Sequence, residues 1–289
     1  MPTHQFDLTC FGAAHVDLIA KARETLVPFS STPGRITRAV GGVASNVARQ
    51  LIRQDVSVAM VSQVGQDVDG DYVCQRLAQA GVNTDQIMRT ESEATGCYLA
   101  IEDSAGDLAM AVSDTHALLS MKPGELFEAA LRNVSARYWL LDANLTPDMI
   151  DGLTAIENHP PIAIDAVSVS KATRLRSKLR DYCLIFCNLD EAEALLDQKF
   201  NSSREAGKAM AAQTVQNSII TNGPHPLSVQ TGTVVDLIEV PAVEVSSVTG
   251  AGDALIAGTL AGLVAGQSLM QAATQGISAA ADQLRGQTS

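Results

Sequence analysis

The sequence has few aromatic residues and no long apolar run. Phe, Trp and Tyr make up 4% of its 289 residues, so the core must be built mainly from Ala, Val, Leu and Ile. The most apolar stretch, ALIAGTLAGLVAG, is shorter than the about 20 residues that a membrane-spanning helix needs. The first residues, MPTHQFDLTC, lack the basic start and apolar core of a secretory signal peptide. These absences predict a cytoplasmic protein with no membrane partner.

Cysteine and positive charge are also scarce. The five cysteines are an odd number, and their spacing matches neither a disulfide framework nor a zinc ribbon, so we expect free thiols. Lys and Arg total 20 against 32 Asp and Glu, which gives a formal net charge of −12. A field of this sign repels phosphate backbones, so nucleic acid is not an expected partner. An anionic substrate would need a local positive site.

Short apolar runs alternate with helical segments along most of the chain. The sequence predicts strands at residues 6–12, 57–65, 136–143, 161–167, 183–188 and 217–223, and helices at 44–54, 69–81, 146–158, 189–198, 252–266 and 269–284. Such alternation is typical of an α/β fold with a doubly wound, mostly parallel sheet flanked by helices on both faces.

Two stretches interrupt this alternation. Residues 92–114 contain two alternating runs around SAGD, which indicates a β-hairpin, and residues 16–40 are extended without a helical period. Together they predict a small antiparallel β-sheet that forms a lid beside the main sheet. Since no linker or internal repeat is visible, we expect one domain over residues 1–289, with the lid formed by roughly 16–40 and 92–114.

The segment VTGAGDA combines small residues with a carboxylate at the start of an apolar helix. Gly250, Ala251 and Gly252 let backbone N–H groups approach a ligand, and a helix N-terminus adds unpaired donors and a positive dipole. This arrangement suits a phosphoryl group in transfer. Asp253, in the first turn, would then be the general base for a substrate hydroxyl. The alternative is an ordinary acidic residue that favours the helix dipole.

The segment VGGVASNVA places two glycines before a helix. The turn at Gly41 and Gly42 lets backbone amides bind sugar hydroxyls, and Asn46 supplies a donor and an acceptor. The alternative is a plain loop-to-helix junction capped by Ser45 or Asn46.

Two acidic segments follow strands. In CNLDEAEAL, Asn188 and Glu191 lie one helical turn apart, and their oxygens suit Mg²⁺ bound through water. An Asn N-cap with Glu as its capping-box partner explains them equally well. In VGQDVDGD, the residues Gly65, Asp67 and Gly70 predict a structural turn that caps the next helix.

Taken in order, Asp17, GGxxxN, GxDxxG, NxxE and TGAGD resemble the PfkB, or ribokinase-like, family of small-molecule kinases over nearly the whole chain. The resemblance implies a doubly wound α/β fold with a β-sheet lid over the sugar site. It also implies transfer of the γ-phosphoryl group of ATP, with Mg²⁺, to a hydroxymethyl group of a sugar or nucleoside.

The resemblance implies roles for particular residues. It makes Asp253 the catalytic base, and it makes Asn188 and Glu191 the motif that governs magnesium and phosphate. The remaining positions are the anion hole at Gly250, Ala251 and Gly252, the nucleotide contacts Thr221, Gly223 and Thr249, and the sugar contacts Asp17, Gly41, Gly42 and Asn46.

Within the family, several segments resemble the members that act on pseudouridine. These segments are TPGRITRAVGGVASNVA, AMAVSDTHALL, LLDANLTPDMI and IDAVSVSKATRLR. They imply that the acceptor is the 5′-hydroxyl of a ribosyl compound, pseudouridine above all. The alternatives are another sugar or nucleoside kinase, such as ribokinase or an adenosine- or inosine-type enzyme, and a nucleoside-binding regulator that kept the fold without turnover.

This resemblance adds further substrate contacts. Asn144 is expected to read a base edge or a ribose hydroxyl, and Ser113 and Asp114 are expected to face the base from the end of the lid hairpin. Lys171 is another candidate contact, with a solvated side chain as the alternative. His15 takes the place of an Asn that is common in the family, so we expect an altered ribose contact.

The sequence departs from the family pattern at two further places. Ser247 and Val248 stand where Asp-Thr is usual, which predicts little potassium dependence and makes a monovalent cation doubtful. Pro224 and Pro226 stiffen the loop after the nucleotide strand. Because an open β-lid exposes strand edges, the sequence also allows a homodimer through the lid.

Overall fold

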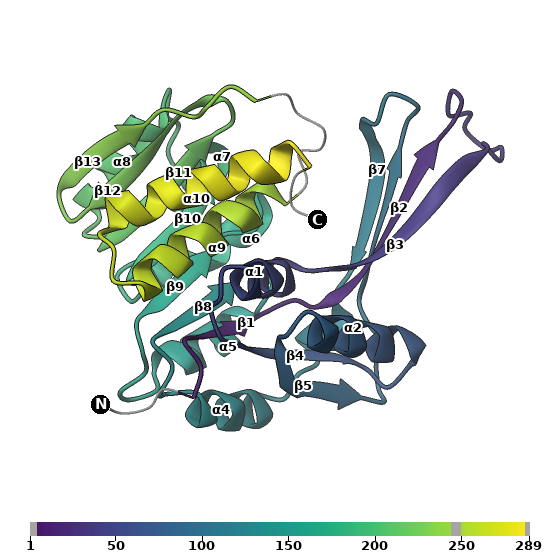
Figure 1. Cartoon of the computed structure of the whole chain (residues 1–289), viewed down its shortest axis with the longest axis horizontal. Coiled ribbons are helices and arrows are strands. Elements are labelled where there is room, and N and C mark those ends of the chain that lie inside the picture. Colours follow the sequence, from purple (N-terminus) through teal and green to yellow (C-terminus); the bar gives the residue numbers. More distant parts are fainter. Residues whose placement is uncertain (1–4, 244–249, 287–289) are drawn as a thin grey trace.

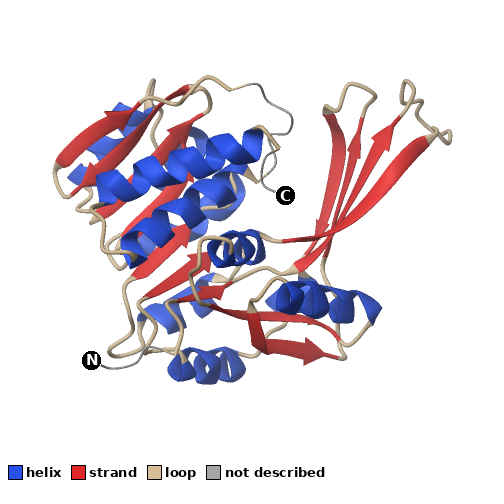
Figure 2. Cartoon of the chain, in the orientation of Figure 1, coloured by secondary structure: helices blue, strands red, loops and turns tan. Residues whose placement is uncertain are grey.

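A nine-stranded sheet forms the centre of the computed structural model, which describes residues 5–243 and 250–286 (Figure 2). Its order is β13-β12-β11-β10-β9-β8-β1-β4-β5. The strands from β11 to β5 pair in parallel, whereas β12 and β13 form an antiparallel edge. Their bounds are β1 (Leu8–Phe11), β4 (Val58–Gly65), β5 (Asn83–Thr90), β8 (Tyr138–Asp142), β9 (Ile162–Asp165), β10 (Leu184–Asn188), β11 (Asn217–Asn222), β12 (His225–Thr231) and β13 (Val234–Ile238).

Helices cover both faces of this sheet, which confirms the predicted doubly wound fold (Figure 1). Consecutive residues of a strand serve opposite faces: Cys10 packs in one apolar core and Phe11 in the other. One face carries α1 (Val43–Ile52), α2 (Val68–Gln79), α9 (Ala251–Val264) and α10 (Leu269–Leu284). The other carries α3 (His116–Leu119), α4 (Pro123–Arg132), α5 (Pro147–Thr154), α6 (Val169–Ala172), the 3₁₀ turn Thr173–Lys178, α7 (Leu189–Leu196) and α8 (Ser203–Ala212).

A second sheet of four strands projects from this body as the lid (Figure 1). Its order is β3 (Gly34–Gly41), β2 (His15–Ala22), β6 (Cys97–Glu102) and β7 (Leu108–Asp114). The hairpin β6–β7 was expected, whereas residues 16–40 were expected only to be extended, and they form a second hairpin, β2–β3. A purely antiparallel lid is wrong, because β2 and β6 pair in parallel. Both strands leave the body and run outward, so they point the same way where they meet.

Some elements were not predicted from the sequence. β5, α4, α8 and the hairpin β12–β13 all lie outside the expected strands and helices. Within the described residues, no helix is both long enough and apolar enough to cross a bilayer. The five cysteines are all free, as expected.

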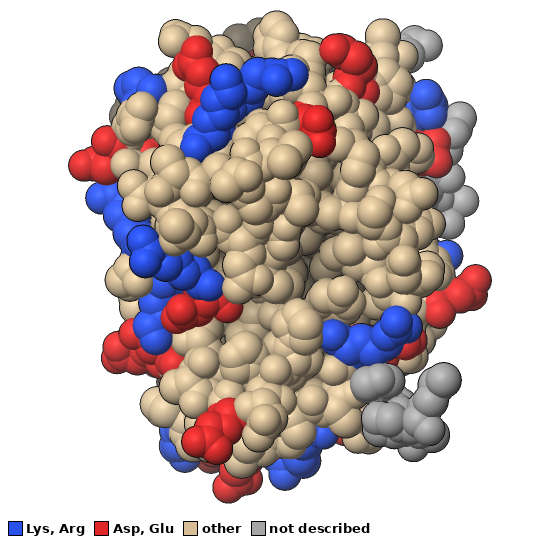
Figure 3. Space-filling view, turned by 90° about the vertical axis from the view of Figure 1, so that its left-hand side faces the viewer, with Lys and Arg blue, Asp and Glu red and all other residues tan. Residues whose placement is uncertain are grey.

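Charged side chains of both signs lie mainly around the edge of the face shown in Figure 3, which leaves a largely uncharged centre. This is the side on which β12 and β13 lie in Figure 1. The surplus of acidic residues is therefore not gathered into one patch on this face.

Candidate functional site

Polar residues gather where the central parallel strands end. β8 ends at Asp142, β9 at Asp165 and β10 at Asn188, and these three strands are neighbours in the sheet. Thr221 of β11 pairs with Asn188. Since ligands of open α/β sheets bind outside the carboxyl ends of the strands, this edge is the expected place for a site.

A cavity of about 180 Å³ lies at this edge, against the start of α9. The structure brings several predicted residues together on its wall: Asn188, Glu191, Thr221, Gly252 and Asp253. Gly250, in the left-handed region at φ 80°, is the N-cap of α9, and Ala251 is its first residue. The cavity therefore meets a helix N-terminus whose first turn carries a carboxylate, which is the arrangement predicted from VTGAGDA.

Asp253 has a specific partner and a perturbed acidity. Its Oδ2 accepts a hydrogen bond of 2.8 Å from Nδ2 of Asn46, which lies on α1. Burial raises the pKa of Asp253 to about 6; the bond from Asn46 opposes this rise, and the negative charge of Asp142 adds to it. At neutral pH the carboxylate is thus mostly ionised, with a proton affinity well suited to a general base.

The glycine pair brings α1 close to the lid strand β2. Gly42, not Ser45 or Asn46, is the N-cap of α1, and its φ of 99° favours glycine. A Cβ on Gly41 would lie 1.9 Å from Oδ1 of Asp17, so only glycine leaves room for that carboxylate. Asp17 also lies 3.1 Å from Nδ1 of His15. The predicted sugar contacts His15, Asp17 and Gly41 therefore form one cluster at the root of the lid.

Asp142 is a buried carboxylate to which the sequence analysis gave no role. Its Oδ2 accepts hydrogen bonds of 3.0 Å from the backbone N–H groups of Ala13 and Ala44, and its Oδ1 accepts one of 3.0 Å from that of Asn144. It thereby ties the end of β1, the start of α1 and the end of β8. Burial still raises the pKa of Asp142 above the ordinary range. The sequence signal was its place at the end of an apolar strand.

Asn188 and Glu191 adopt the capping-box arrangement that was the alternative explanation for them. Asn188 Oδ1 accepts from the N–H of Glu191, and Glu191 Oε2 accepts from the N–H of Asn188, both at 2.9 Å. The box holds both side chains on the cavity wall. Burial raises the pKa of Glu191, with the charge of Asp190 adding to it.

Asp165 is a second functional candidate that was not predicted from the sequence. It lines the same cavity from the end of β9. Burial raises its pKa well above the ordinary range, and the charges of Glu191 and Asp253 add to that rise. Carboxylates that face one cavity repel each other unless a proton or a cation joins them. Among residues 5–243 and 250–286, no group of three or more His, Cys, Asp or Glu could bind a metal ion directly. The oxygens of Asn188, Glu191 and Asp165 on this wall fit Mg²⁺ that is held through water.

The lid register decides which lid residues share a face with Asp17. Asp17 pairs with Tyr98, which pairs with Ser113, so these three side chains lie in one row across the sheet. Asp114 points to the opposite face, because side chains alternate along a strand. It also binds His116, through the backbone N–H at 3.0 Å and Nδ1 at 2.7 Å. Ser113 therefore shares the face of Asp17 and Asp114 does not, so the two cannot both face one base, and Tyr98 is an aromatic residue on the Asp17 face that was not anticipated.

Asn144 and Lys171 bind each other. Lys171 Nζ donates to Asn144 Oδ1 at 2.5 Å, and Asn144 is buried. Burial lowers the pKa of Lys171, and Asp142 opposes that change. Lys171 is thus half-buried and paired rather than simply solvated.

The remaining nucleotide positions lie farther along the sheet edge. Gly223, at φ 55°, turns the chain between β11 and β12, and no atom would meet a Cβ there within 4 Å. The turn is tight, since Asn222 pairs with His225. Thr249, and the departures at Ser247 and Val248, lie outside the described residues.

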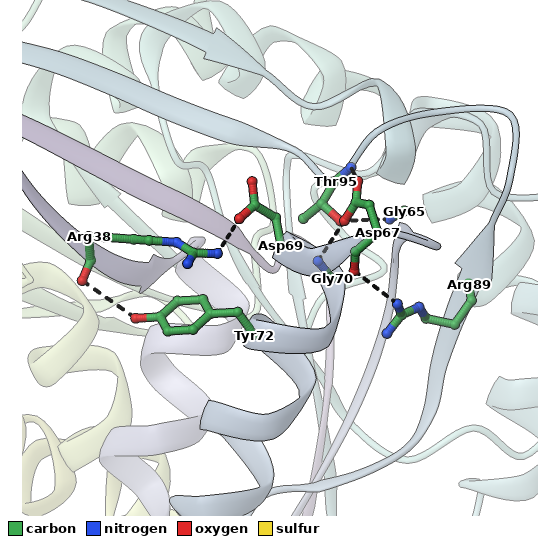
Figure 4. A network of polar contacts seen from close by, with 8 residues as sticks. All are labelled: Arg38, Gly65, Asp67, Asp69, Gly70, Tyr72, Arg89 and Thr95. Carbon is green, nitrogen blue, oxygen red and sulfur yellow. Dashed lines mark hydrogen bonds and ion pairs between the residues drawn. The ribbon is translucent and has the colours of Figure 1, made fainter.

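A polar network connects the lid to the body (Figure 4). Asp67 caps α2 as expected, and its Oδ1 accepts from Gly70 N at 2.7 Å. The same carboxylate accepts from Thr95 N at 2.8 Å and Thr95 Oγ1 at 2.6 Å, just before the lid strand β6. Arg38 of β3 reaches Asp69 of α2 and lies 4.0 Å from the centre of the Tyr72 ring.

The comparisons with known proteins all point to kinases of one family. The profile described as pfkB family carbohydrate kinase matches residues 5–286. The chain is 28% identical to the uncharacterized sugar kinase YeiI of Escherichia coli over 73% of this chain and 58% of that protein, so it spans less than two thirds of this relative. It is 25% identical to the pseudouridine kinase of E. coli, covering 86% of this chain and 80% of the relative. A guanosine-inosine kinase of Exiguobacterium acetylicum is 25% identical, covering 95% and 93%.

Solved structures agree in fold. A carbohydrate kinase from Agrobacterium tumefaciens superposes with a TM-score of 0.84 at 30% identity, covering 95% of this chain and 89% of that one. The Arabidopsis thaliana ribokinase complexed with ribose and ATP gives a TM-score of 0.82 at 16% identity, covering 97% and 93%.

Proposed function

Because the chain belongs to the pfkB family of carbohydrate kinases, we propose that it transfers the γ-phosphoryl group of ATP to the 5′-hydroxyl of a ribosyl nucleoside, with pseudouridine as the first candidate. One observation carries the proposal: Asp253 stands in the first turn of α9, on the wall of a cavity that also holds the NxxE pair. A base beside a helix N-terminus has the parts that phosphoryl transfer needs.

In the proposed reaction, Asp253 accepts the proton of the 5′-hydroxyl while that oxygen bonds to the γ-phosphorus and the bond to the β,γ-bridging oxygen breaks. Backbone N–H groups of 250–252 stabilise the charge on the phosphoryl oxygens. The root of the lid, with Asp17 and Gly41, orients the ribose. ADP and the nucleoside 5′-phosphate are the products.

Magnesium would be held through water at the wall formed by Asn188 and Glu191, where it would neutralise charge on the ATP phosphates. The capping box gives that wall its rigidity, since each side chain is held by the backbone N–H of the other residue. Thr221, next to Asn188 in the sheet, extends the wall toward the turn at Gly223 and marks the side on which we place the nucleotide.

Two observations favour pseudouridine as the acceptor. A relative named pseudouridine kinase aligns with most of the chain, and Tyr98, on the lid face of Asp17, offers a ring on which a base can stack. The guanosine-inosine kinase relative supports a second candidate acceptor, a purine nucleoside. A regulator without turnover would keep the lid contacts but would not need an ionised base beside the helix N-terminus.

We also propose a homodimer through the lid. On the face opposite to Asp17, Ile36, Leu99, Met110 and Val112 are 38–70% exposed. Clustered apolar side chains on a monomer surface often mark a protein interface. A second copy of the same chain presents the same surface, as a two-fold interface requires.

The test is an ATP-consumption assay with Mg²⁺ and a panel of acceptors: pseudouridine, uridine, adenosine, inosine, guanosine, ribose and fructose. We expect pseudouridine to give the highest kcat/KM, and Asp253→Asn to lower kcat by about 10²–10⁴-fold while ATP still binds. A preference for inosine or guanosine would keep the mechanism and change the acceptor. ATP binding without turnover of any acceptor would favour the regulator.

A further inference from the structure

Arg49 lies on α1, one turn after Asn46, and contacts two parts of the site. Its Nη2 donates to Asn46 Oδ1 at 2.5 Å and to the backbone oxygen of Val40 at 2.9 Å. Val40 is the residue of β3 just before the glycine pair. Residues three apart on a helix share a face, so the contact with Asn46 follows from the helix itself. Arg49 therefore joins the lid root to the residue that binds Asp253.

The guanidinium determines which way the amide of Asn46 points. A side-chain amide is nearly symmetric in shape, so its partners decide its orientation. Arg49 can only donate, so Asn46 must turn Oδ1 toward it and Nδ2 toward Asp253. The reversed amide would set its NH₂ group against the guanidinium and its oxygen against a carboxylate. The observed bond of 2.8 Å from Asn46 to Asp253 Oδ2 requires the first arrangement.

This arrangement has a consequence for Asp253. A donor on Oδ2 stabilises the ionised carboxylate and fixes its rotation, which leaves Oδ1 for a substrate hydroxyl. The positive charge of Arg49 acts in the same direction. Four acidic groups lie on the elements around Asp253 and oppose the effect of Arg49. They are Asp17 on β2, Asp142 on β8, Asp165 on β9 and Glu191 on α7.

We propose that Arg49 is a positioning residue for phosphoryl transfer: it holds Asn46 in the orientation that presents Asp253, and it ties that orientation to the lid strand β3. The inference rests on the proposed function for its kinetic readout. Its structural content, the chain Val40–Arg49–Asn46–Asp253, stands on the contacts alone.

The test compares Arg49→Met, which keeps the aliphatic stem, with Arg49→Lys and with Arg53→Met as the matched control. Arg53 is the exposed C-cap of the same helix, so its loss removes the same charge without the contact to Asn46. We expect Arg49→Met to lower kcat roughly 10-fold or more, because the base loses both its alignment and a nearby cation. KM for ATP should stay unchanged, because Arg49 is not among the proposed nucleotide contacts. Arg49→Lys, a donor-only cation, should recover part of the rate.

A pH series separates positioning from a general loss of structure. In Arg49→Met the acidic limb of kcat/KM should move to higher pH, because a cation and a fixed donor near Asp253 are gone. Arg53→Met should leave the limb in place. Equal kcat values and identical limbs in the two Met variants would overturn the proposal.

A second readout does not depend on turnover. In protein labelled with ¹³C at the Asp carboxyls, the Asp253 signal is identified by its loss in Asp253→Asn and then titrated. Its midpoint should rise in Arg49→Met and not in Arg53→Met. A rise of the midpoint in Arg49→Met alone would support the role of Arg49, whether or not the wild-type protein phosphorylates an acceptor. Failure of the wild-type protein to phosphorylate any acceptor would refute the proposed function, but not this role. An unmoved midpoint in folded Arg49→Met, checked by circular dichroism, would refute the role of Arg49.

Discussion

At the scale of single residues, the carboxylates of the candidate site differ in their surroundings and contacts. Asp253 faces the cavity, where we propose that it acts as a base, whereas Asp142 is buried and accepts hydrogen bonds from backbone N–H groups of three segments. Both follow small or apolar residues in the sequence, and only their surroundings distinguish them. The helix start in the sequence singled out Asp253 as the candidate base, and the structure places it on the cavity wall. The sequence did not show that Asp142 and Asp165 lie at neighbouring strand ends, since that requires the strand order.

The raised pKa of Asp253 predicts that the wild-type fold is weakened by its own active-site charge. A carboxyl whose pKa rises to about 6 on folding binds its proton more tightly in the folded state, so stability falls as pH rises through 6. We expect Asp253→Asn to raise the free energy of unfolding by about 1–3 kcal/mol at pH 7.5, and by less at pH 5.5. Urea unfolding at the two pH values measures this.

Asp148→Asn is the matched control, because Asp148 also lies in the first turn of a helix but is exposed. Its replacement should change stability by less than about 0.5 kcal/mol at either pH. A destabilised Asp253→Asn at pH 7.5 would show that the carboxylate is better solvated than its surroundings indicate.

At the scale of elements, most of the parallel strands and most of the helices between them followed from apolar alternation, but β5, α4 and α8 did not. The elements that escaped prediction carry a weaker pattern: β5 is a polar edge strand, and the hairpin β12–β13 is joined by a short turn. The parallel pairing of β2 with β6 was not visible either, because it joins two hairpins far apart in the chain. Local sequence indicates the hairpin at 92–114 and an extended run at 16–40, but not how the two pair.

The contacts of Asp67 with Gly70 of α2 and with Thr95 before β6, which we call the lid anchor, predict a coupled loss of stability and acceptor binding. Asp67→Ala removes the cap of α2 and both bonds from Thr95, so we expect the free energy of unfolding to fall by about 2 kcal/mol and KM for the acceptor to rise several-fold. Ser202→Ala removes the cap of α8, away from the lid, and should cost about 1 kcal/mol with KM unchanged. Denaturant melts and acceptor titrations test both. Equal KM values would mean that the anchor does not control the lid.

At the scale of the whole molecule, the lid presents two unlike faces. One holds Asp17, Tyr98 and Ser113. The other is joined to α2 through Arg38, and it exposes the apolar side chains Ile36, Leu99, Met110 and Val112. The first face serves the proposed acceptor, and the second serves the proposed dimer.

The dimer proposal predicts that a charge on the apolar face changes the mass in solution. We expect the wild-type chain to elute as a dimer in size-exclusion chromatography with light scattering, and Met110→Glu to shift it toward the monomer, because burying a charge opposes association. Ala111→Glu places the same charge on the same strand but on the opposite face, and should leave the dimer intact. A wild-type monomer at micromolar concentration would rule out the dimer.

The parallel pair β2–β6 also constrains when the lid can form. The strand β2, residues 15–22, cannot pair with β6, residues 97–102, until these distant segments meet, and the chain between them forms β4, α2 and β5 of the body. Contacts between distant segments are slow to form, because loop closure must come first. The lid is therefore a late unit of folding that rests on a finished body. A unit of this kind can open without the body unfolding, so access to the proposed acceptor site would depend on a local opening equilibrium and not on the stability of the whole chain.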